Sequence, residues 1–211
     1  MNTRRDFLTN AALASAAAVA AIAGVQQFAS AQSSAFGRVA RFSGADRKAY
    51  PDVILRDQDN QPLRFYEEII RDRVVVINMA YAECLGICPL AARNLKKLHR
   101  AMRDRVGRDF HMYTLTLDPL RDRPEKLKYY MRREGIPDQG WQFLTGTVGD
   151  IQLVRRRLGF FDVDPLIDAD VQQHTGMVAI GNDRYDWWCS TPALASEQTL
   201  VTAVERMLKY G

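Results

Sequence analysis

Blocks of apolar and polar residues follow one another along the chain and predict alternating strands and helices. Residues 74–79 (Val-Val-Val-Ile-Asn-Met) form a β-branched run that is typical of a strand buried on both faces. After Pro89, Leu95, Leu98 and Met102 recur at helical spacing, with basic residues on the other faces. The same reading predicts strands at 110–117, 142–144, 175–180 and 185–188, and helices at 124–134, 150–158 and 196–209.

The order of these elements indicates the fold class. Residues 53–55 and 62–65 flank an Asp/Asn-rich turn, which predicts a β-hairpin ahead of the first buried strand. Strands that alternate with helices, followed by a second hairpin and a closing helix, indicate an α/β layer with a mixed sheet. This order resembles a thioredoxin-like fold, a central mixed β-sheet flanked by helices, with an added N-terminal β-hairpin.

The N-terminal segment has the pattern of an export signal. Paired arginines at 4 and 5 are followed by Phe-Leu, as in twin-arginine signals. The apolar run at 11–25 is short for a membrane span and falls in the signal-peptide range, and Ala29-Ser30-Ala31 offers the small residues that a signal peptidase needs. The pattern predicts cleavage after Ala31.

Three segments are therefore expected: a twin-arginine-type signal peptide at 1–31, a flexible leader at 32–49 and a thioredoxin-like domain at 50–211. The domain then lies in the periplasm, and the chain contacts the membrane only before cleavage. An uncleaved N-terminal membrane anchor is the alternative, and it also places the domain outside the cytoplasm.

Composition excludes several classes of protein. Of the 211 residues, 47% are hydrophobic and 26% charged, which excludes wholesale disorder, collagen and coiled-coil rods. No apolar run reaches the ~20 residues of a spanning helix, so a polytopic membrane protein is excluded. Three cysteines are too few for a disulfide-stapled miniprotein. The net charge of +4 is spread over the whole chain, and no nucleic-acid partner is expected.

Two cysteines carry the candidate chemistry. Cys84 and Cys88 lie where the buried strand gives way to a helix, and the unpaired N–H groups and dipole of that helix stabilise thiolates. A spacing of four brings both side chains together if the loop coils into the first helical turn. Such a pair forms a redox-active disulfide or binds a soft metal ion. A structural disulfide and two buried free thiols are the alternatives.

His174 is the candidate third ligand. In a thioredoxin-like sheet, the loop before the strand at 175–180 lies against the strand–helix junction that carries the cysteines. Two thiolates suit Cu(I), an added imidazole suits Cu(II) as well, and zinc accepts the same ligands. Of the other histidines, His99 is expected on the solvated surface of its helix, and His111 is expected to be a packing residue.

Two further features favour a metal site over a plain oxidoreductase. Redox-active thioredoxins have two residues between their cysteines, whereas this chain has three. They also normally carry a cis-proline in the loop before this strand. In this chain Pro165 comes too early and Pro192 too late, so His174 stands where that proline is expected.

From about residue 50 to 209 the chain is similar to the Sco/SenC family of copper proteins. The resemblance rests on five matches in order: Tyr81, the Cys84-x-x-x-Cys88-Pro89 core, the segment 116–125 (TLDPLRDRPE), the segment 144–147 (LTGT) and His174. It implies copper binding through Cys84, Cys88 and His174. It also implies that the protein delivers copper to the binuclear site of cytochrome c oxidase subunit II, or keeps the cysteines of that site reduced.

The chain also departs from the family pattern. Leu85-Gly86-Ile87 replaces the usual Pro-Asp-Val, and Gln172-Gln173 replaces Val-Asp before the histidine, while Glu83 is gained. Another exported copper enzyme is therefore an alternative acceptor. Since thiols must be reduced before they bind metal, a thiol reductant protein is a second expected partner.

Three more residues have open roles. Asp118 and Glu83 are expected near the thiols as supporting residues, with helix capping as the alternative for Asp118. Cys189 is read as a buried free thiol or as a third thiol that exchanges with the pair. Two hypotheses result: a copper metallochaperone, and a periplasmic thiol–disulfide oxidoreductase that cycles Cys84 and Cys88.

Overall fold

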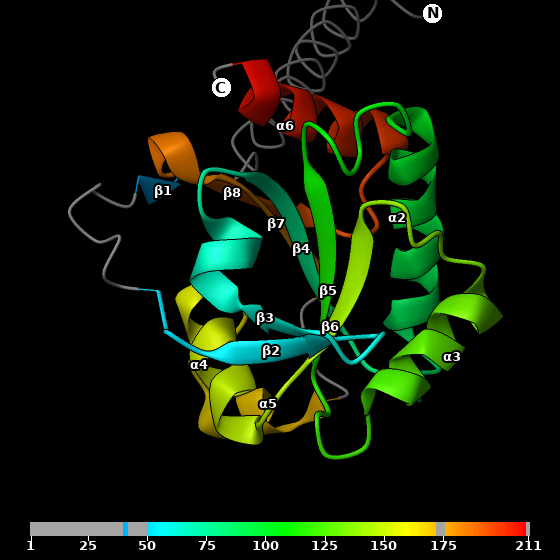
Figure 1. Cartoon of the computed structure of the whole chain (residues 1–211), viewed down its shortest axis with the longest axis vertical. Helices are drawn as coiled ribbons and strands as arrows, with labels where there is room; N and C mark the ends of the chain where they lie inside the picture. Colours follow the sequence, from blue (N-terminus) through cyan, green and yellow to red (C-terminus); the bar gives the residue numbers. More distant parts are fainter. Residues whose placement is uncertain (1–39, 42–49, 172–175, 210–211) are drawn as a thin grey trace, which may run out of the picture. The chain divides into compact units, whose positions relative to one another are not determined.

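The computed structural model describes residues 40–41, 50–171 and 176–209, and within these residues eight strands form one sheet. Their bounds are β1 Ala40–Arg41, β2 Ile54–Asp57, β3 Pro62–Arg64, β4 Val74–Ala80, β5 His111–Thr116, β6 Trp141–Thr145, β7 Met177–Asn182 and β8 Trp187–Pro192. The strand order across the sheet is β1-β8-β7-β4-β5-β6-β2-β3 (Figure 1).

The sheet is mixed, with β4 near its centre. β4 pairs in parallel with β5 and antiparallel with β7, while β5 pairs in parallel with β6. The β2–β3 hairpin joins the sheet through an antiparallel pairing of β2 with β6. The predicted thioredoxin-like fold and its added N-terminal hairpin are therefore confirmed.

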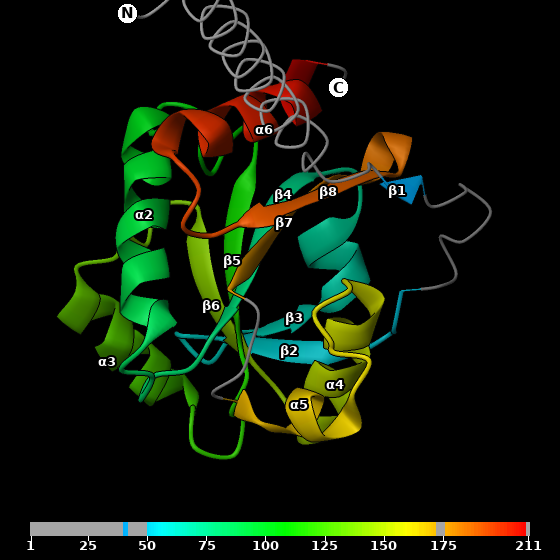
Figure 2. The same cartoon turned by 180° about the vertical axis from the view of Figure 1, so that it is seen from behind.

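Helices cover both faces of the sheet (Figure 1 and Figure 2). Val74 and Val76 pack with α2, α3 and α6 on one face, and Val75 and Ile77 pack with η2 and α4 on the other. This two-sided burial accounts for the continuous β-branched run. The bounds are the π-helix η2 Phe65–Ile70, α2 Ile87–Ala101, α3 Pro124–Glu134, α4 Val148–Arg157, α5 Pro165–Ala169, the 3-10 helix η4 Asp183–Tyr185 and α6 Glu197–Lys209.

The predicted boundaries hold best where local signals are strong. α3 begins at Pro124 and ends before Gly135, whose φ of 59° is the left-handed conformation that glycine adopts readily. The prediction was wrong at 185–188, because η4 occupies the chain reversal and β8 starts later, at Trp187. Neither η2 nor α5 was predicted, since short helices leave little periodicity in the sequence.

The predicted signal peptide at 1–31 lies outside the described residues. Within the predicted leader, Ala40 and Arg41 form β1, which pairs antiparallel with Trp188 and Trp187. Every described residue falls within the compact unit Val39–Gly211. Among the described helices, none combines the length and apolar character that crossing a membrane requires.

The prediction for His99 was wrong. Its side chain is buried, its Nε2 lies 2.7 Å from the carbonyl oxygen of Gln139, and its ring stacks on Trp141. The apolar stripe of α2 is thus wider than the leucine spacing suggests. His111 is half-buried at the start of β5 and stacks on Tyr113, as expected of a packing residue.

Candidate metal centre

The structure brings Cys84 and Cys88 together beyond the end of β4. A tight turn follows the strand, closed by a hydrogen bond from the Cys84 N–H to the Tyr81 carbonyl oxygen at 3.2 Å, and α2 begins at Ile87. Both thiols are buried and reduced, and a hydrogen bond joins them. With Ala80 they form a small apolar cluster that Tyr81 and Ile87 cover.

The two thiols differ in their ionisation. Burial opposes ionisation of Cys84, but hydrogen bonds from the Cys88 thiol, the Cys88 and Gly86 N–H groups and the Tyr81 hydroxyl outweigh it and lower its pKa. Burial raises the pKa of Cys88, and the neighbouring Cys84 raises it further. Of the two, Cys84 is therefore the thiol that ionises first, beside a Cys88 thiol that is still neutral.

Tyr81 takes part in this hydrogen-bond network. Burial, followed by the charge of Cys84, raises the pKa of Tyr81 to about 12, so its hydroxyl stays a donor. The sequence predicted no role for Tyr81 at the site, and the residue entered only as one of the matches to the family. Its position three residues before the first cysteine was the available signal.

Asp122 holds the turn that leads to Cys84, and sequence reasoning missed it. Its carboxylate is buried at 1% exposure, and Oδ2 accepts hydrogen bonds from the Ala82 N–H at 2.9 Å and the Thr116 hydroxyl at 2.7 Å. Burial raises the pKa of Asp122. The residue lies within the segment 116–125 that carries the family resemblance, which was the one sequence signal for it.

The carboxylate of Glu83 is directed to basic residues. It lies 2.7 Å from the Lys126 ammonium and 3.6 Å from the Arg121 guanidinium, and the hydrogen bond from Lys126 lowers its pKa. The negative charge gained beside Cys84 is therefore paired with cations from α3 and the loop before it.

Asp118 lies in that same loop, after β5. Its N–H donates to the Thr116 hydroxyl oxygen at 2.9 Å, and its carboxylate pairs with Arg121. Because Arg123 occupies the N-cap position of α3, Asp118 does not cap that helix.

His174 lies outside the described residues. The described chain resumes at Gly176, which has a φ of 57°, and a β-carbon there would lie 2.3 Å from the Cδ1 of Ile87. Among the described residues, no group of three or more His, Cys, Asp or Glu side chains is arranged to hold a metal ion. The described part of the predicted site thus consists of two thiols.

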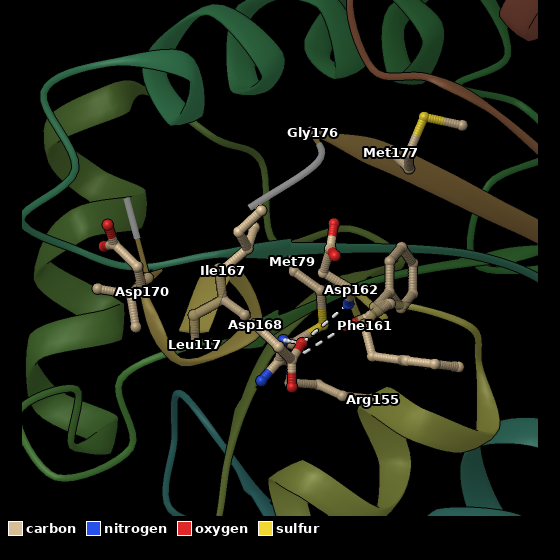
Figure 3. Close-up of a pocket in the computed structure, with 12 residues that line it drawn as sticks. Met79, Leu117, Arg155, Phe161, Asp162, Ile167, Asp168, Asp170, Gly176 and Met177 are labelled. Carbon is tan, nitrogen blue, oxygen red and sulfur yellow. Dashed lines mark hydrogen bonds and ion pairs between the residues drawn. The ribbon is translucent and has the colours of Figure 1, made fainter. Parts of the chain in front are cut away.

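A pocket lies beside Gly176, on the face that α4 and α5 cover, and neither cysteine lines it (Figure 3). The Arg155 guanidinium bridges to the Asp168 carboxylate at 2.7 Å, which also accepts the Asp162 N–H at 3.0 Å, so α5 is fastened to α4. The lining residues are Met79, Leu117, Arg155, Phe160, Phe161, Asp162, Ile167, Asp168, Asp170, Val171, Gly176 and Met177.

Cys189 is separate from the thiol pair. It lies in β8 opposite Ile180 of β7 and packs against the apolar cluster of the α2 and α6 face. Burial raises its pKa, so it is a neutral thiol.

Solved structures match this arrangement of strands and helices. A SCO1/SenC family lipoprotein from Bacillus anthracis aligns with a TM-score of 0.64 at 16% identity, covering 82% of this chain and 99% of that one. ScoI of Bradyrhizobium japonicum, solved with copper bound, gives 0.59 at 18% identity, with 73% and 96% covered. BsSco, a member of the Sco family of cytochrome c oxidase assembly proteins in which a disulfide switch was identified, gives 0.61 at 16%, with 77% and 94% covered.

Sequence comparison leads to the same group. A Stutzerimonas stutzeri protein named for copper binding is 28% identical over 112 residues, which is 53% of this chain and about half, 52%, of that protein. The SCO1/SenC family model matches residues 53–209, from the residue before β2 through α6. Since that match takes in the cysteine pair, the segment 116–125 and the whole described sheet apart from β1, the chain belongs to the SCO1/SenC family.

Proposed function

We propose that this protein is an exported copper metallochaperone that binds copper through Cys84, Cys88 and His174. The observation that carries the proposal is the pair of adjacent, hydrogen-bonded thiols at the end of β4 in a chain of this family. Copper is the cargo, and it leaves by ligand exchange with the acceptor.

The donor set suits copper in both oxidation states. Two sulfur ligands favour Cu(I), and an imidazole adds the nitrogen that Cu(II) prefers. Gly176 supports His174 as the third ligand, because it stands two residues further along the chain and lies against Ile87, next to Cys88. Copper bound to ScoI of B. japonicum is consistent with this cargo.

The acceptor that we propose is subunit II of cytochrome c oxidase, at its binuclear copper site, or another exported copper enzyme. Membership of BsSco in a family of cytochrome c oxidase assembly proteins supports the first. Leu85 is 95% exposed between the two cysteines, and Gly86 stands where the family usually has an aspartate, so an acceptor meets an exposed apolar side chain and no carboxylate there. A thiol reductant protein keeps the pair reduced for loading.

We further propose that the protein acts in the periplasm after cleavage of residues 1–31. The twin-arginine pattern and the small residues at 29–31 support export, and residues 50–211 then form the working domain. A retained N-terminal anchor is the alternative.

Titration of the reduced protein against a competing Cu(I) chelator tests the copper proposal. We expect one Cu(I) per chain, with tight binding lost in Cys84→Ser and in Cys88→Ser because each leaves a single thiolate. Cys189→Ser is the matched control, since this thiol lies in β8 outside the pair, and it should bind as the wild type does. Wild-type affinity in Cys84→Ser would remove the cysteine pair from the site.

The second candidate function is thiol–disulfide reduction, and the unequal pKa values of the pair favour it. The Cys84 thiolate would attack a client disulfide and release one client thiolate. Cys88, on losing its proton, would then attack the mixed disulfide and release the second. The client gains two electrons, Cys84 and Cys88 become a disulfide, and the thiol reductant restores them.

A further inference from the structure

We infer that Asp122 is the residue that positions Cys84 for copper, by fixing the backbone of the turn that Ala82 and Glu83 form before it. This inference rests on the proposed copper site, and it concerns how the first thiol is held in place. Asp122 touches neither thiol in the contacts described above and acts through Ala82.

The bonds to Asp122 join the turn to the sheet. Oδ2 of Asp122 accepts the Ala82 N–H and the Thr116 hydroxyl together, and Thr116 is the last residue of β5, opposite Ala80 in the parallel register with β4. The Leu117 N–H also donates to the Ala80 carbonyl oxygen at 2.9 Å. The turn is thus tied to the adjacent strand β5.

Helix α3 holds the other groups of the same turn. The Arg133 guanidinium donates to the Ala82 carbonyl oxygen at 3.3 Å, and the Lys126 ammonium binds the Glu83 carboxylate at 2.7 Å. Lys126 also lies 3.8 Å from the other carboxylate oxygen of Asp122. Both backbone groups of Ala82 are therefore bonded to side chains. Of these two side chains, that of Asp122 is the buried one.

The consequence for Cys84 follows from chain geometry. Cys84 is two residues beyond Ala82, and its N–H closes the turn on Tyr81. If the Ala82 N–H loses its acceptor, a buried donor is left unpaired and the turn shifts to satisfy it. The Cys84 sulfur moves with the turn, whereas Cys88 is held in α2. Loss of a residue that orients a metal ligand typically weakens metal affinity by about 10–100-fold.

Three variants test the inference. Asp122→Ala removes both hydrogen bonds, and we expect about 10–100-fold weaker Cu(I) binding in chelator competition. Asp122→Asn keeps an oxygen that accepts both bonds, so it should restore affinity to within about threefold of the wild type. Asp183→Ala is the matched control, because Asp183 is also buried and its carboxylate also accepts a backbone N–H, that of Asp72 at 3.0 Å. Asp72 lies just before the start of β4, whereas the turn with Ala82 follows its end. Its affinity should equal that of the wild type.

Amide hydrogen exchange of the reduced, copper-free protein gives a readout that does not depend on copper. Asp122→Ala should speed exchange at Ala82 and Cys84 and leave Asp72 unchanged, while Asp183→Ala should do the reverse. If the wild type binds no Cu(I), the proposed function fails, and exchange at Cys84 still decides whether Asp122 positions that residue.

Equal copper affinity in Asp122→Ala and the wild type, or an equal loss in Asp183→Ala, would overturn the inference. If Asp122→Ala does not fold, Thr116→Val serves in its place, since it keeps the side-chain shape and removes one of the two donors to Asp122, together with the acceptor of the Asp118 N–H. We then expect severalfold weaker Cu(I) binding and faster exchange at Ala82, and wild-type values for both would contradict the inference.

Discussion

Gly176 and Ile87 are in contact so close that a β-carbon on Gly176 would lie 2.3 Å from the Cδ1 of Ile87. Gly176 also has a φ of 57°, and its carbonyl oxygen accepts the Ala193 N–H at 2.8 Å. The start of β7 is therefore fitted against the residue that precedes Cys88, and glycine suits the left-handed backbone there without displacing the Ile87 side chain.

Replacing this glycine should destabilise the protein. Gly176→Ala combines a left-handed backbone, which costs a residue with a β-carbon about 1–2 kcal/mol, with the contact to Ile87. Urea unfolding of the reduced protein measures this change. When Ile87→Ala is added to the Gly176→Ala chain, the loss of stability caused by the steric contact should disappear. The loss caused by the left-handed backbone should remain.

Gly149→Ala is the control for this substitution. Gly149 lies in α4, where an added β-carbon meets only the Thr147 hydroxyl oxygen at 3.9 Å, so alanine should stabilise the helix by about 0.5–1 kcal/mol. A Gly176→Ala protein as stable as the wild type would mean that the start of β7 has room for a side chain.

The two cysteines should titrate separately in the reduced, copper-free protein. The pKa of Cys84 is lowered and that of Cys88 raised, so as pH rises the thiolate forms first on Cys84. The Cβ chemical shifts of ¹³C-labelled cysteine, followed by NMR from pH 5 to 11, show which thiol ionises first, and Cys88 should stay protonated after Cys84 has ionised.

Tyr81→Phe should raise the pKa of Cys84 in this titration, because it removes a hydroxyl that donates to the thiolate. Tyr185→Phe is a suitable control, since Tyr185 lies in η4 and stacks on Trp187. A first transition assigned to Cys88 would contradict the described network of hydrogen bonds.

His174→Ala should separate the two candidate functions. If His174 is a copper ligand, the variant loses the visible thiolate-to-Cu(II) absorption, because Cu(II) prefers nitrogen donors, and keeps much of its Cu(I) binding. In a pure reductase the variant instead changes the rate of disulfide exchange. An unchanged Cu(II) spectrum with an altered exchange rate would favour the enzyme.

Export should give a mature protein that begins at Gln32. The alanine-rich run and the small residues at 29–31 predict this cleavage, and N-terminal sequencing of the exported protein measures it. Replacing the arginines at 4 and 5 by lysine should abolish transport by the twin-arginine route. A membrane-bound product that retains them would show an anchor instead.

Sequence reasoning succeeded where a signal was local. The bounds of α3 follow from Pro124 and Gly135, and the meeting of Cys84 and Cys88 follows from their spacing at a strand–helix junction. The role of Asp122 was not predictable in this way, since its bond to Ala82 joins residues 40 positions apart. The burial of His99 likewise depends on Trp141, a residue of β6.

The two outer strands of the sheet have a consequence for self-association. β3 has three residues and includes Pro62, which has no N–H to donate, and the other described edge, β1, has two residues. Long unpaired edges allow copies of a protein to pair strand to strand and aggregate, whereas such short ones offer few hydrogen-bonding groups to a second copy. Copies of this protein should therefore pair poorly with one another along these two described edges.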